Sequence, residues 1–280
     1  KLFNLENQFK LEEIFYENKI DVVYHAAAYK HVPLVEINKT EGVRNNLSTT
    51  MSVCMASIKR KISKVVLISS DKAVRPSNIM GATKLFSELI VKELSNSSNG
   101  STIFSSVRFG NVIDSSGSVI PLFRSQIKSG GPITITHPDM ERYFMTIAEA
   151  VNLVLEASVI MKGGETFILD MGERIKIIDL AKNMIKASGL ELKNNENKSG
   201  DIEIKINGIR PGEKIKEELT INGFRDKTIH PLINIARENI NLPKDFLNNI
   251  NQVIYLLKNN QEKKAIVIFD ALFKEISNNY

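Results

Sequence analysis

One stretch of the chain, residues 65–84, combines an apolar run, a polar turn and the start of a helix. Residues 65–68 read Val-Val-Leu-Ile between polar neighbours, which is typical of a strand buried inside a parallel sheet. A helix is predicted over residues 80–94, because Leu85 and Leu89 fall on one helical face. A buried strand followed by an amphipathic helix predicts an α/β fold.

Polar side chains gather where the predicted strand ends. Residues 69–72 supply two hydroxyls, a carboxylate and an amine at its carboxyl end, where open α/β sheets bind their ligands. Met80 and Lys84, four residues apart, lie one turn apart on a second face of the helix. We therefore expect the turn and the beginning of the helix to form one site.

The composition is that of an ordinary globular protein. The 280 residues are 42% hydrophobic and 25% charged, enough for one large or two modest cores. The longest apolar runs, such as residues 265–269, are much shorter than the roughly 20 residues of a membrane span, so we expect no direct membrane contact. The single cysteine, Cys54, excludes an internal disulfide and suits a reducing cytoplasm. We predict no metal site.

The net charge is mildly positive. Lys and Arg number 37 against 32 Asp and Glu, and the excess of five is spread along the chain. This balance favours anionic ligands but lacks the clustered pattern of a nucleic-acid binder, so we expect no nucleic-acid partner. The chain begins without methionine and without a signal-peptide pattern, and we expect it to be a piece of a longer protein.

The beginning of the chain resembles the end of a crossover unit, with a helix over residues 11–18 and a strand over residues 21–24. Dinucleotide-binding folds open with a Gly-x-Gly-x-x-Gly turn that holds the pyrophosphate at a helix N-terminus. No two of the fifteen glycines are separated by a single residue, so this turn is absent. A further βαβ unit of roughly 30 residues or more, upstream of Lys1, would be needed to supply it.

Apolar spacing predicts further helices over residues 40–59, 147–161 and 177–188, and strands over residues 102–109, 166–169 and 201–206. Residues 95–101 read as a polar loop, and short strands and turns begin near Ser115. The predicted organisation is a partial dinucleotide-binding domain over 1–112, a substrate-binding portion over 113–223, with residues 165–188 returning to the first domain, and a C-terminal helical extension over 224–280.

Five stretches resemble one family, the CapD/WbpM-like polysaccharide-biosynthesis proteins, which are nucleotide-sugar dehydratases of the extended short-chain dehydrogenase type. The similar stretches are residues 25–33, 69–76, 80–84, 108–112 with 115–121, and 210–214. The resemblance implies an NAD(P)-binding, Rossmann-like, doubly wound parallel sheet whose first βαβ units are missing here. It also implies conversion of UDP-N-acetylglucosamine to its 4-keto-6-deoxy derivative in bacterial surface polysaccharide biosynthesis.

By this resemblance, the catalytic residues are Ser70, Asp71, Lys72, Met80 and Lys84. Asp71 is implied as the acid at the sugar C6 and Lys72 as the base at C5. Lys84 is implied to hold the nicotinamide ribose of NAD or NADP. An adjacent carboxylate and amine each favour the charged form of the other, so a basic Lys72 would need partial desolvation by substrate.

The resemblance also assigns binding residues, each with a plainer alternative. Ala26 and Ala27 are implied to contact the cofactor, although small residues also simply pack. Lys30 and Asn111 are implied to lie near the sugar nucleotide, although an asparagine can simply terminate a strand. Arg210 is implied to face the nucleotide phosphates and Glu213 its ribose, although a charged turn is more often solvated surface. Asn46 matches a family asparagine near the catalytic helix.

Met80 occupies the position where most short-chain dehydrogenases carry the tyrosine that removes the C4 proton. A thioether cannot remove a proton, so one interpretation is an inactive enzyme or plain helix packing. The large membrane-anchored branch of the family also has methionine there, and that branch implies an inner-membrane anchor upstream. Candidates for the C4 base are then Asp71, Ser70 or Lys84 through water.

Two alternatives to the dehydratase stay open. One is an epimerase of the same fold that acts on the same nucleotide sugar. The other is a UDP-sugar-binding fragment that is catalytically incomplete because the pyrophosphate turn is absent. In each case we expect a UDP-sugar ligand, and we expect a homo-oligomer.

Overall fold

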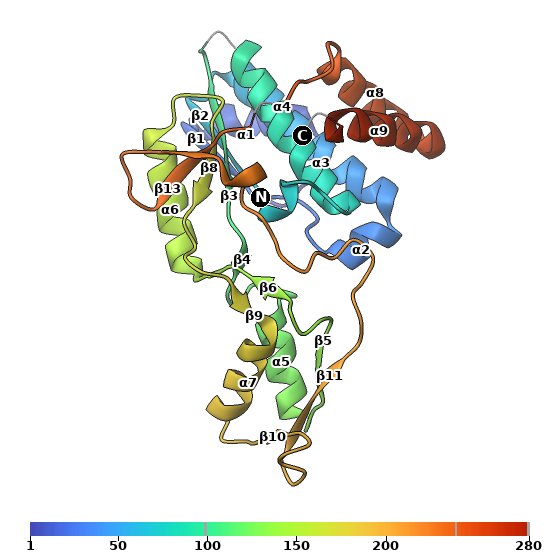
Figure 1. The fold of residues 1–280 in the computed structure, drawn as a ribbon. Helices are drawn as coiled ribbons and strands as arrows, with labels where there is room; N and C mark the ends of the chain where they lie inside the picture. Colours follow the sequence, from blue (N-terminus) through green and yellow to red (C-terminus); the bar gives the residue numbers. More distant parts are fainter. Residues whose placement is uncertain (98–99, 239, 279–280) are drawn as a thin grey trace. The chain divides into compact units, whose positions relative to one another are not determined.

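The computed structural model describes residues 1–97, 100–238 and 240–278, and it divides into two compact units (Figure 1). Unit 1 comprises residues 1–109, 153–169 and 218–280, and unit 2 comprises residues 110–152 and 170–217. Each unit has a core of its own. In the part of the chain that the structure describes, no helix combines the length and the apolar content of a membrane span.

A six-stranded sheet forms the centre of unit 1 (Figure 1). Its order is β1 (Val22–His25), β2 (Lys64–Ile68), β3 (Ile103–Arg108), β8 (Thr166–Leu169), β13 (Ile233–Ala236) and β12 (Arg225–Lys227). The first four strands are parallel, and the last two pair antiparallel. The predicted Rossmann-like parallel sheet is confirmed.

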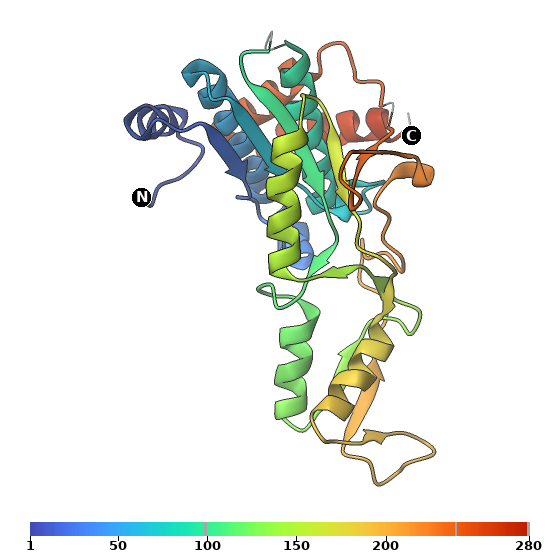
Figure 2. The same cartoon turned by 90° about the vertical axis from the view of Figure 1, so that its left-hand side faces the viewer.

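Helices cover both faces of this sheet. Figure 2 shows α6 (Ile147–Ile160) in front of the strands, with α3 (Lys39–Arg60) and α4 (Ile79–Ser97) behind them. The two shorter helices α1 (Gln8–Asn18) and α2 (Val32–Ile37) flank β1 in the sequence. Because α4 extends to Ser97, the predicted polar loop at 95–101 begins later than expected, and residues 98 and 99 lie outside the described residues.

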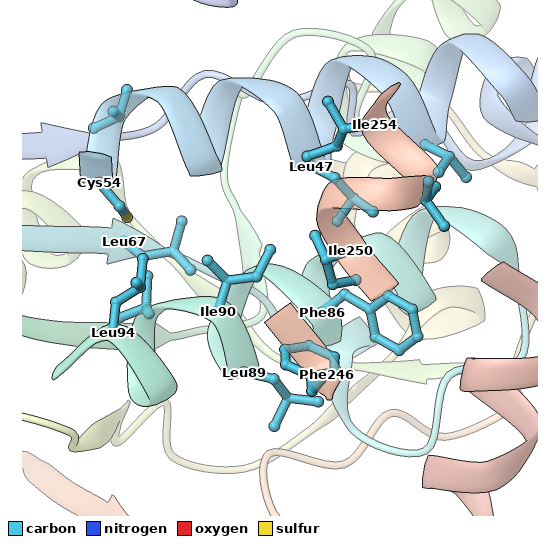
Figure 3. Close-up of a cluster of buried hydrophobic side chains, with 14 of the residues drawn as sticks. Leu47, Cys54, Leu67, Phe86, Leu89, Ile90, Leu94, Phe246, Ile250 and Ile254 are labelled. Atoms are coloured by element: carbon cyan, nitrogen blue, oxygen red, sulfur yellow. The ribbon is translucent and has the colours of Figure 1, made fainter. Parts of the chain in front are cut away.

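The core of unit 1 includes a C-terminal helix pair, α8 (Phe246–Lys258) and α9 (Glu262–Ser277). Phe86 of α4 is fully buried, and its ring centroid lies 5.9 Å from that of Phe246 (Figure 3). The ring centroid of Phe269 lies 4.9 Å from that of Phe86. The range 224–280 was expected as a helical extension. It instead supplies two strands to the central sheet and a helix pair to the main core, because α8 and α9 each carry an apolar face that α3 and α4 bury.

Unit 2 has a smaller core between two helices and a short sheet. Helices α5 (Val119–Lys128) and α7 (Ile177–Ala187) bury apolar side chains against a sheet of order β10 (Leu192–Lys193), β11 (Ile202–Ile206) and β5 (Ile133–Ile135). Two further pairs are β4 (Asn111–Val112) with β7 (Phe144–Met145), and β6 (Glu141–Arg142) with β9 (Ile175–Lys176). The predicted return of residues 165–188 to the first domain holds for β8 only. Helix α7 belongs to unit 2, where Ile177 and Ile185 pack in its core.

Candidate active site

In the turn after β2, two polar side chains donate to one carboxylate oxygen. Ser70 Oγ donates a hydrogen bond of 2.8 Å to Asp71 Oδ1, and Lys72 Nζ donates one of 2.9 Å to the same oxygen. Asp71 is fully buried, and its Oδ2 has no hydrogen-bond partner among the described residues. The turn therefore holds a buried carboxylate in which Oδ1 accepts two hydrogen bonds and Oδ2 accepts none from the described residues.

Main-chain hydrogen bonds to the end of β3 fix this turn. The Ser69 amide donates to the Val107 carbonyl at 2.8 Å, and the Asp71 amide donates to the Phe109 carbonyl at 3.1 Å. Residues 71–73 then form a single 3-10 turn, and the Ser70 hydroxyl caps it by accepting from the Lys72 amide at 3.3 Å. The parallel sheet thus places Asp71 at the carboxyl edge of two adjacent strands, as the sequence predicted for residues 69–72.

A glycine lets α4 begin directly against the turn. A Cβ atom at Gly81 would lie 2.4 Å from the Lys72 carbonyl oxygen, closer than real side chains come. The first turn of α4 is capped from two sides. Asn78 Oδ1 accepts from the Gly81 amide at 2.8 Å, and Glu36 Oε1 accepts from the Ile79 amide at 2.6 Å. Met80, in the same turn, is buried with 2% of its surface exposed. A buried thioether therefore occupies the position where the resemblance led us to look for a tyrosine.

Lys84 lies one turn further along α4 and reaches back to β2. Its Nζ donates a hydrogen bond of 3.0 Å to the carbonyl of Ile68, the last residue of that strand. Burial lowers the pKa of Lys84 to about 8, against the opposing effect of the Glu88 charge. The structure therefore brings Ser70, Asp71, Lys72, Met80 and Lys84 to the end of one strand.

Asn46 ties the loop after β1 to this helix. Its Oδ1 accepts from the Tyr29 amide at 2.7 Å, and its Nδ2 donates to the Tyr29 carbonyl at 3.1 Å and to Thr83 Oγ1 at 2.9 Å. The side chain is buried on α3, between the loop and α4. It therefore fixes the backbone of the loop in which the cofactor and substrate contacts were predicted.

That loop is accessible. Ala26, Ala27 and Lys30 are exposed, so neither alanine serves as core packing. A hollow of about 440 Å³ lies beside the loop. Its lining includes Ala28, Lys30 and Gly42. The exposed alanines leave room for the close approach of a flat ring, which is what the cofactor prediction requires.

His25, at the end of β1, is a buried residue that the sequence did not single out. Its Nε2 lies 3.2 Å from Thr50 Oγ1, and Thr50 in turn donates to the Asn46 carbonyl at 2.8 Å. Burial and then the positive charge of Lys84 lower the pKa of His25 to about 4. A neutral His25 imidazole therefore contacts Thr50, which in turn is hydrogen-bonded to Asn46.

The other predicted substrate residues lie in unit 2. Asn111 is half-buried on β4, and Arg210 is exposed. Glu213 Oε2 accepts from the Arg210 amide at 3.3 Å, and Glu213 Oε1 accepts from Thr136 at 3.2 Å. These contacts order the turn and leave the Arg210 guanidinium at the surface of its unit.

Arg142 shapes the same turn and was missed by sequence reasoning. Only 7% of its surface is exposed, and its guanidinium donates to the carbonyls of Lys214 at 2.7 Å and Ile215 at 3.0 Å. Glu213 lies 3.8 Å away as an ion partner. Nothing local to residues 141–143 indicates this, because the partners are more than 70 positions away.

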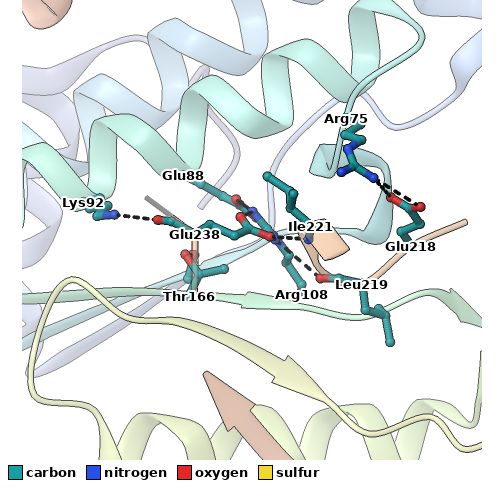
Figure 4. A network of polar contacts seen from close by, with 10 residues as sticks. Arg75, Glu88, Lys92, Arg108, Thr166, Glu218, Leu219, Ile221 and Glu238 are labelled. Carbon is teal, nitrogen blue, oxygen red and sulfur yellow. Dashed lines mark hydrogen bonds and ion pairs between the residues drawn. The ribbon is translucent and has the colours of Figure 1, made fainter. Parts of the chain in front are cut away.

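A buried ionic network fixes Arg108 at the end of β3 (Figure 4). Arg108 is 1% exposed and donates to both carboxylate oxygens of Glu88, at 2.8 and 2.5 Å. It donates to both oxygens of Glu238 as well, at 2.7 and 2.8 Å. Burial alone would lower the pKa of Arg108, but the charges of Glu88 and Glu238 raise it. The network joins β3, α4 and the segment that follows β13.

The fold of this chain is similar to the folds of several solved structures. Pen from Bacillus thuringiensis is 38% identical, has a TM-score of 0.76, and is matched over 86% of this chain and 72% of its own. The UDP-glucose 4-epimerase of Thermus thermophilus, solved in complex with NAD, has a TM-score of 0.65 at 18% identity, with 78% of this chain and 74% of that chain covered. Unit 1 therefore has a Rossmann-like α/β fold.

Residues 1–238 match the family described as polysaccharide biosynthesis protein, and the chain belongs to that family. The capsular polysaccharide biosynthesis protein CapD of Staphylococcus aureus is 52% identical over 228 residues, which are 81% of this chain and 36% of CapD. The UDP-glucose 4-epimerase of Rickettsia canadensis is 40% identical over 201 residues, which are 71% of this chain and 56% of that protein. The chain thus spans between about a third and somewhat more than half of these relatives. The predicted family is confirmed.

Proposed function

We propose that this chain is the catalytic part of an NAD(P)-dependent nucleotide-sugar 4,6-dehydratase that acts on UDP-N-acetylglucosamine in bacterial surface polysaccharide biosynthesis. The observation that carries the proposal is the set of hydrogen bonds at the end of β2. The Asp71 carboxylate accepts from Ser70 and Lys72, and Lys84 donates to the carbonyl of Ile68, the last residue of the same strand. Membership of the polysaccharide biosynthesis family supports it.

The residues of unit 1 fit the nicotinamide end of the cofactor. Ala26 and Ala27 leave an exposed, uncrowded strand end, and Lys84 supplies an amine there. NAD(P) held there would supply the reversible hydride transfer that oxidation at the sugar C4 and reduction at C6 require. The turn that would hold the pyrophosphate, Gly-x-Gly-x-x-Gly, is not among these 280 residues, so the fit concerns this end of the cofactor alone.

The turn provides an acid and a base that share one hydrogen bond. Dehydration needs a base that removes the C5 proton and an acid that protonates the departing C6 hydroxyl. Transfer of a proton along the 2.9 Å contact from Lys72 Nζ to Asp71 Oδ1 would convert the pair into a neutral amine and a carboxylic acid. In that form Lys72 takes the C5 proton and Asp71 gives its proton to the leaving oxygen.

The C4 proton needs a separate acceptor, because Met80 has no titratable group. Asp71, Ser70 and Lys84 through water are the candidates. Asp71 Oδ2 has no hydrogen-bond partner among the described residues, and burial lowers the pKa of Lys84 to about 8, which favours the neutral amine that can accept a proton. The Ser70 hydroxyl donates to Asp71 Oδ1, so as the C4 base it would pass its own proton to that carboxylate.

Binding of the sugar nucleotide is assigned to four residues. Lys30 and Asn111 would contact the sugar, Arg210 the phosphates and Glu213 the ribose. An exposed guanidinium on an ordered turn suits phosphate because its planar donors bind two oxygens at once. We expect the protein to be a cytoplasmic homo-oligomer, with any membrane anchor outside these residues.

A UDP-sugar epimerase is the second candidate. The relative of Rickettsia canadensis named UDP-glucose 4-epimerase, at 40% identity, favours it. The third candidate, a binding fragment without activity, follows from the missing pyrophosphate turn. Mass spectrometry of the product formed from UDP-N-acetylglucosamine by the full-length gene product separates the first two, and the same assay on the 280-residue chain tests the third. We expect the full-length protein to remove one water. An unchanged mass with inversion at C4 would establish the epimerase. No product from the 280-residue chain with NAD or NADP, where the full-length protein forms one, would favour the binding fragment.

A further inference from the structure

We propose that Arg75 is a positioning residue. Its guanidinium binds Glu218 and Asn222, and these contacts hold the connection between the Ser-Asp-Lys turn and α4 in the conformation that brings both to one strand end. The family resemblance assigns no role to this side chain. The inference rests on the proposed function for its kinetic test alone, because the contacts lie within unit 1 and involve no substrate.

The connection is short, and α4 lies directly against it. Residues 74–78 join the 3-10 turn over 71–73 to the first residue of α4. A Cβ atom at Gly81 would lie 2.4 Å from the Lys72 carbonyl oxygen and 3.2 Å from Cβ of Pro76. The start of α4 therefore touches both the turn and the connection, so a change in the connection would alter the contact between the turn and the helix.

Arg75 has an unfavourable backbone conformation in the middle of this connection. Its φ is 39°, in the left-handed region that residues other than glycine rarely adopt. It also precedes Pro76, and the residue before a proline favours an extended conformation. A strained backbone persists only where the surrounding structure holds it. We therefore attribute the conformation of the connection in part to the contacts of the Arg75 side chain.

The guanidinium of Arg75 binds two partners through two different nitrogens (Figure 4). Nη1 donates to Glu218 Oε2 at 3.1 Å, and Nη2 donates to Asn222 Oδ1 at 2.6 Å. The side chains of Arg75 and Glu218 are 40 and 41% exposed, so this ion pair contributes little to the stability of the whole protein. Loss of the pair should therefore change the local order of the connection more than the melting temperature.

The segment that Arg75 binds is itself anchored in unit 1. Arg108 donates to the Leu219 carbonyl at 3.4 Å, and Glu238 Oε1 accepts from the Ile221 amide at 3.1 Å (Figure 4). Arg108 and Glu238 belong to the buried ionic network at the end of β3. Arg75 therefore binds a fixed support.

The same segment is where the chain returns from unit 2. It re-enters unit 1 at Glu218, four positions after the charged turn over 210–214. Within unit 2, Arg142 binds two main-chain carbonyls at the end of that turn. The chain is thus held by an arginine on each side of the junction, by Arg142 in unit 2 and by Arg75 in unit 1.

The first test compares Arg75→Asn with Arg237→Asn in the full-length protein. Asparagine tolerates a left-handed backbone but lacks the guanidinium, so Arg75→Asn removes the contacts at little cost to the backbone. Arg237→Asn is the matched control, because it breaks another exposed ion pair of unit 1, with Asp226 at 2.6 Å. Hydrogen exchange of the Ile79 and Gly81 amides should be faster by roughly tenfold or more in Arg75→Asn and unchanged in the control. Both variants should melt close to the wild type.

The second test is kinetic and uses the sugar-nucleotide substrate. Arg75→Asn should lower kcat by roughly tenfold or more and leave KM nearly unchanged, because Arg75 acts on the turn and the helix and not on the substrate. Arg75→Lys, which keeps a cation for Glu218, should recover part of kcat. Glu218→Ala should lower kcat as well, and the double variant should lose no more than Arg75→Asn alone, since both changes remove one contact.

Unchanged exchange of the two amides in Arg75→Asn would overturn the inference, whether or not the protein is a dehydratase. So would a normal kcat, because Arg75 would then only order a surface connection. A raised KM at normal kcat would assign Arg75 to substrate binding instead. If Arg75→Asn does not fold, Glu218→Ala decides by the same two readouts. Absence of turnover in the wild type would refute the dehydratase, and the exchange comparison would still decide whether Arg75 holds the connection.

Discussion

Lys84 Nζ donates a 3.0 Å hydrogen bond to the main-chain carbonyl of Ile68, and this contact joins α4 to β2, the strand that ends in the Ser-Asp-Lys turn. The amine is held at the strand end by backbone, which no side-chain substitution nearby can remove. Its distance from the turn is therefore set by the fold itself. The same helix is held at its start by the caps from Glu36 and Asn78, so both ends of this short segment are fixed.

The stability of the protein should fall between pH 6.5 and pH 4 because of His25. Folding lowers the pKa of His25 from 6.5 to about 4, so the unfolded chain binds the extra proton over this range. The contribution is complete above pH 6.5 and is lost as the pH falls towards 4, by about 3 kcal/mol. Urea unfolding of the wild type and of His25→Gln at pH 7 and pH 4.5 measures it. A variant with the same pH dependence as the wild type would contradict this assignment.

Asn46→Ala should destabilise the protein by about 1–3 kcal/mol, because it leaves the Tyr29 amide and carbonyl without their partner. Asn248→Ala, on an exposed position of α8, is the control and should change the unfolding midpoint little. Equal effects of the two substitutions would show that Asn46 does not hold the loop.

The strand and helix of residues 65–84 were predictable because their signals are local. A continuous apolar run marks β2, and a spacing of four residues places Met80 and Lys84 one turn apart on α4. The polar turn followed from the rule that ligands gather at the carboxyl ends of parallel strands. The roles of the individual residues rest on family resemblance and stay predictions.

The contacts that hold the site were not predictable, because their partners are far apart in the sequence. Asn46 and Thr83 are separated by 37 positions, and Arg108 and Glu238 by 130. Strand β12 consists of Arg225, Asp226 and Lys227, which carry no apolar alternation, so it was placed in a helical extension. Helix α5 was missed because Val119, Ile120 and Pro121 favour strand or turn, although proline is tolerated in the first turn of a helix.

Glu88→Gln should destabilise the protein by roughly 3–5 kcal/mol, because it breaks a buried ion pair and leaves part of the Arg108 charge unpaired. The matched control is Asp226→Asn, which breaks the exposed pair with Arg237 and should have little measurable effect. Thermal unfolding of both variants tests the contrast. Similar losses in the two variants would mean that the network around Arg108 does not stabilise the fold.

Arg210→Ala should weaken UDP binding by roughly 1.5–3 kcal/mol and leave the fold intact, since a hydrogen bond to a charged group is worth about that much. Calorimetric titration of the full-length protein with UDP gives the dissociation constant. Lys205→Ala, at an exposed position of β11, is the control for the general effect of charge and should bind nearly as the wild type does. An unchanged constant in Arg210→Ala would make this turn ordinary surface.

Asp71→Asn and Lys72→Ala should separate the two proton transfers of dehydration. In the cofactor-loaded full-length protein, Lys72→Ala should lose both water elimination and exchange of the sugar C5 hydrogen with deuterated solvent, by at least about 100-fold, because the C5 base is gone. Asp71→Asn should lose water elimination but keep part of the C5 exchange, because it removes the acid and leaves Lys72 Nζ, whose proton solvent then takes instead of Asp71. NMR of the recovered nucleotide sugar measures the exchange, and mass spectrometry measures the water loss. Circular dichroism shows whether both variants are folded. If Lys72→Ala exchanges the C5 hydrogen at the wild-type rate, or if Asp71→Asn blocks that exchange as completely as Lys72→Ala does, the acid and the base have been assigned to the wrong residues, and the 2.9 Å contact between them serves only to order the turn.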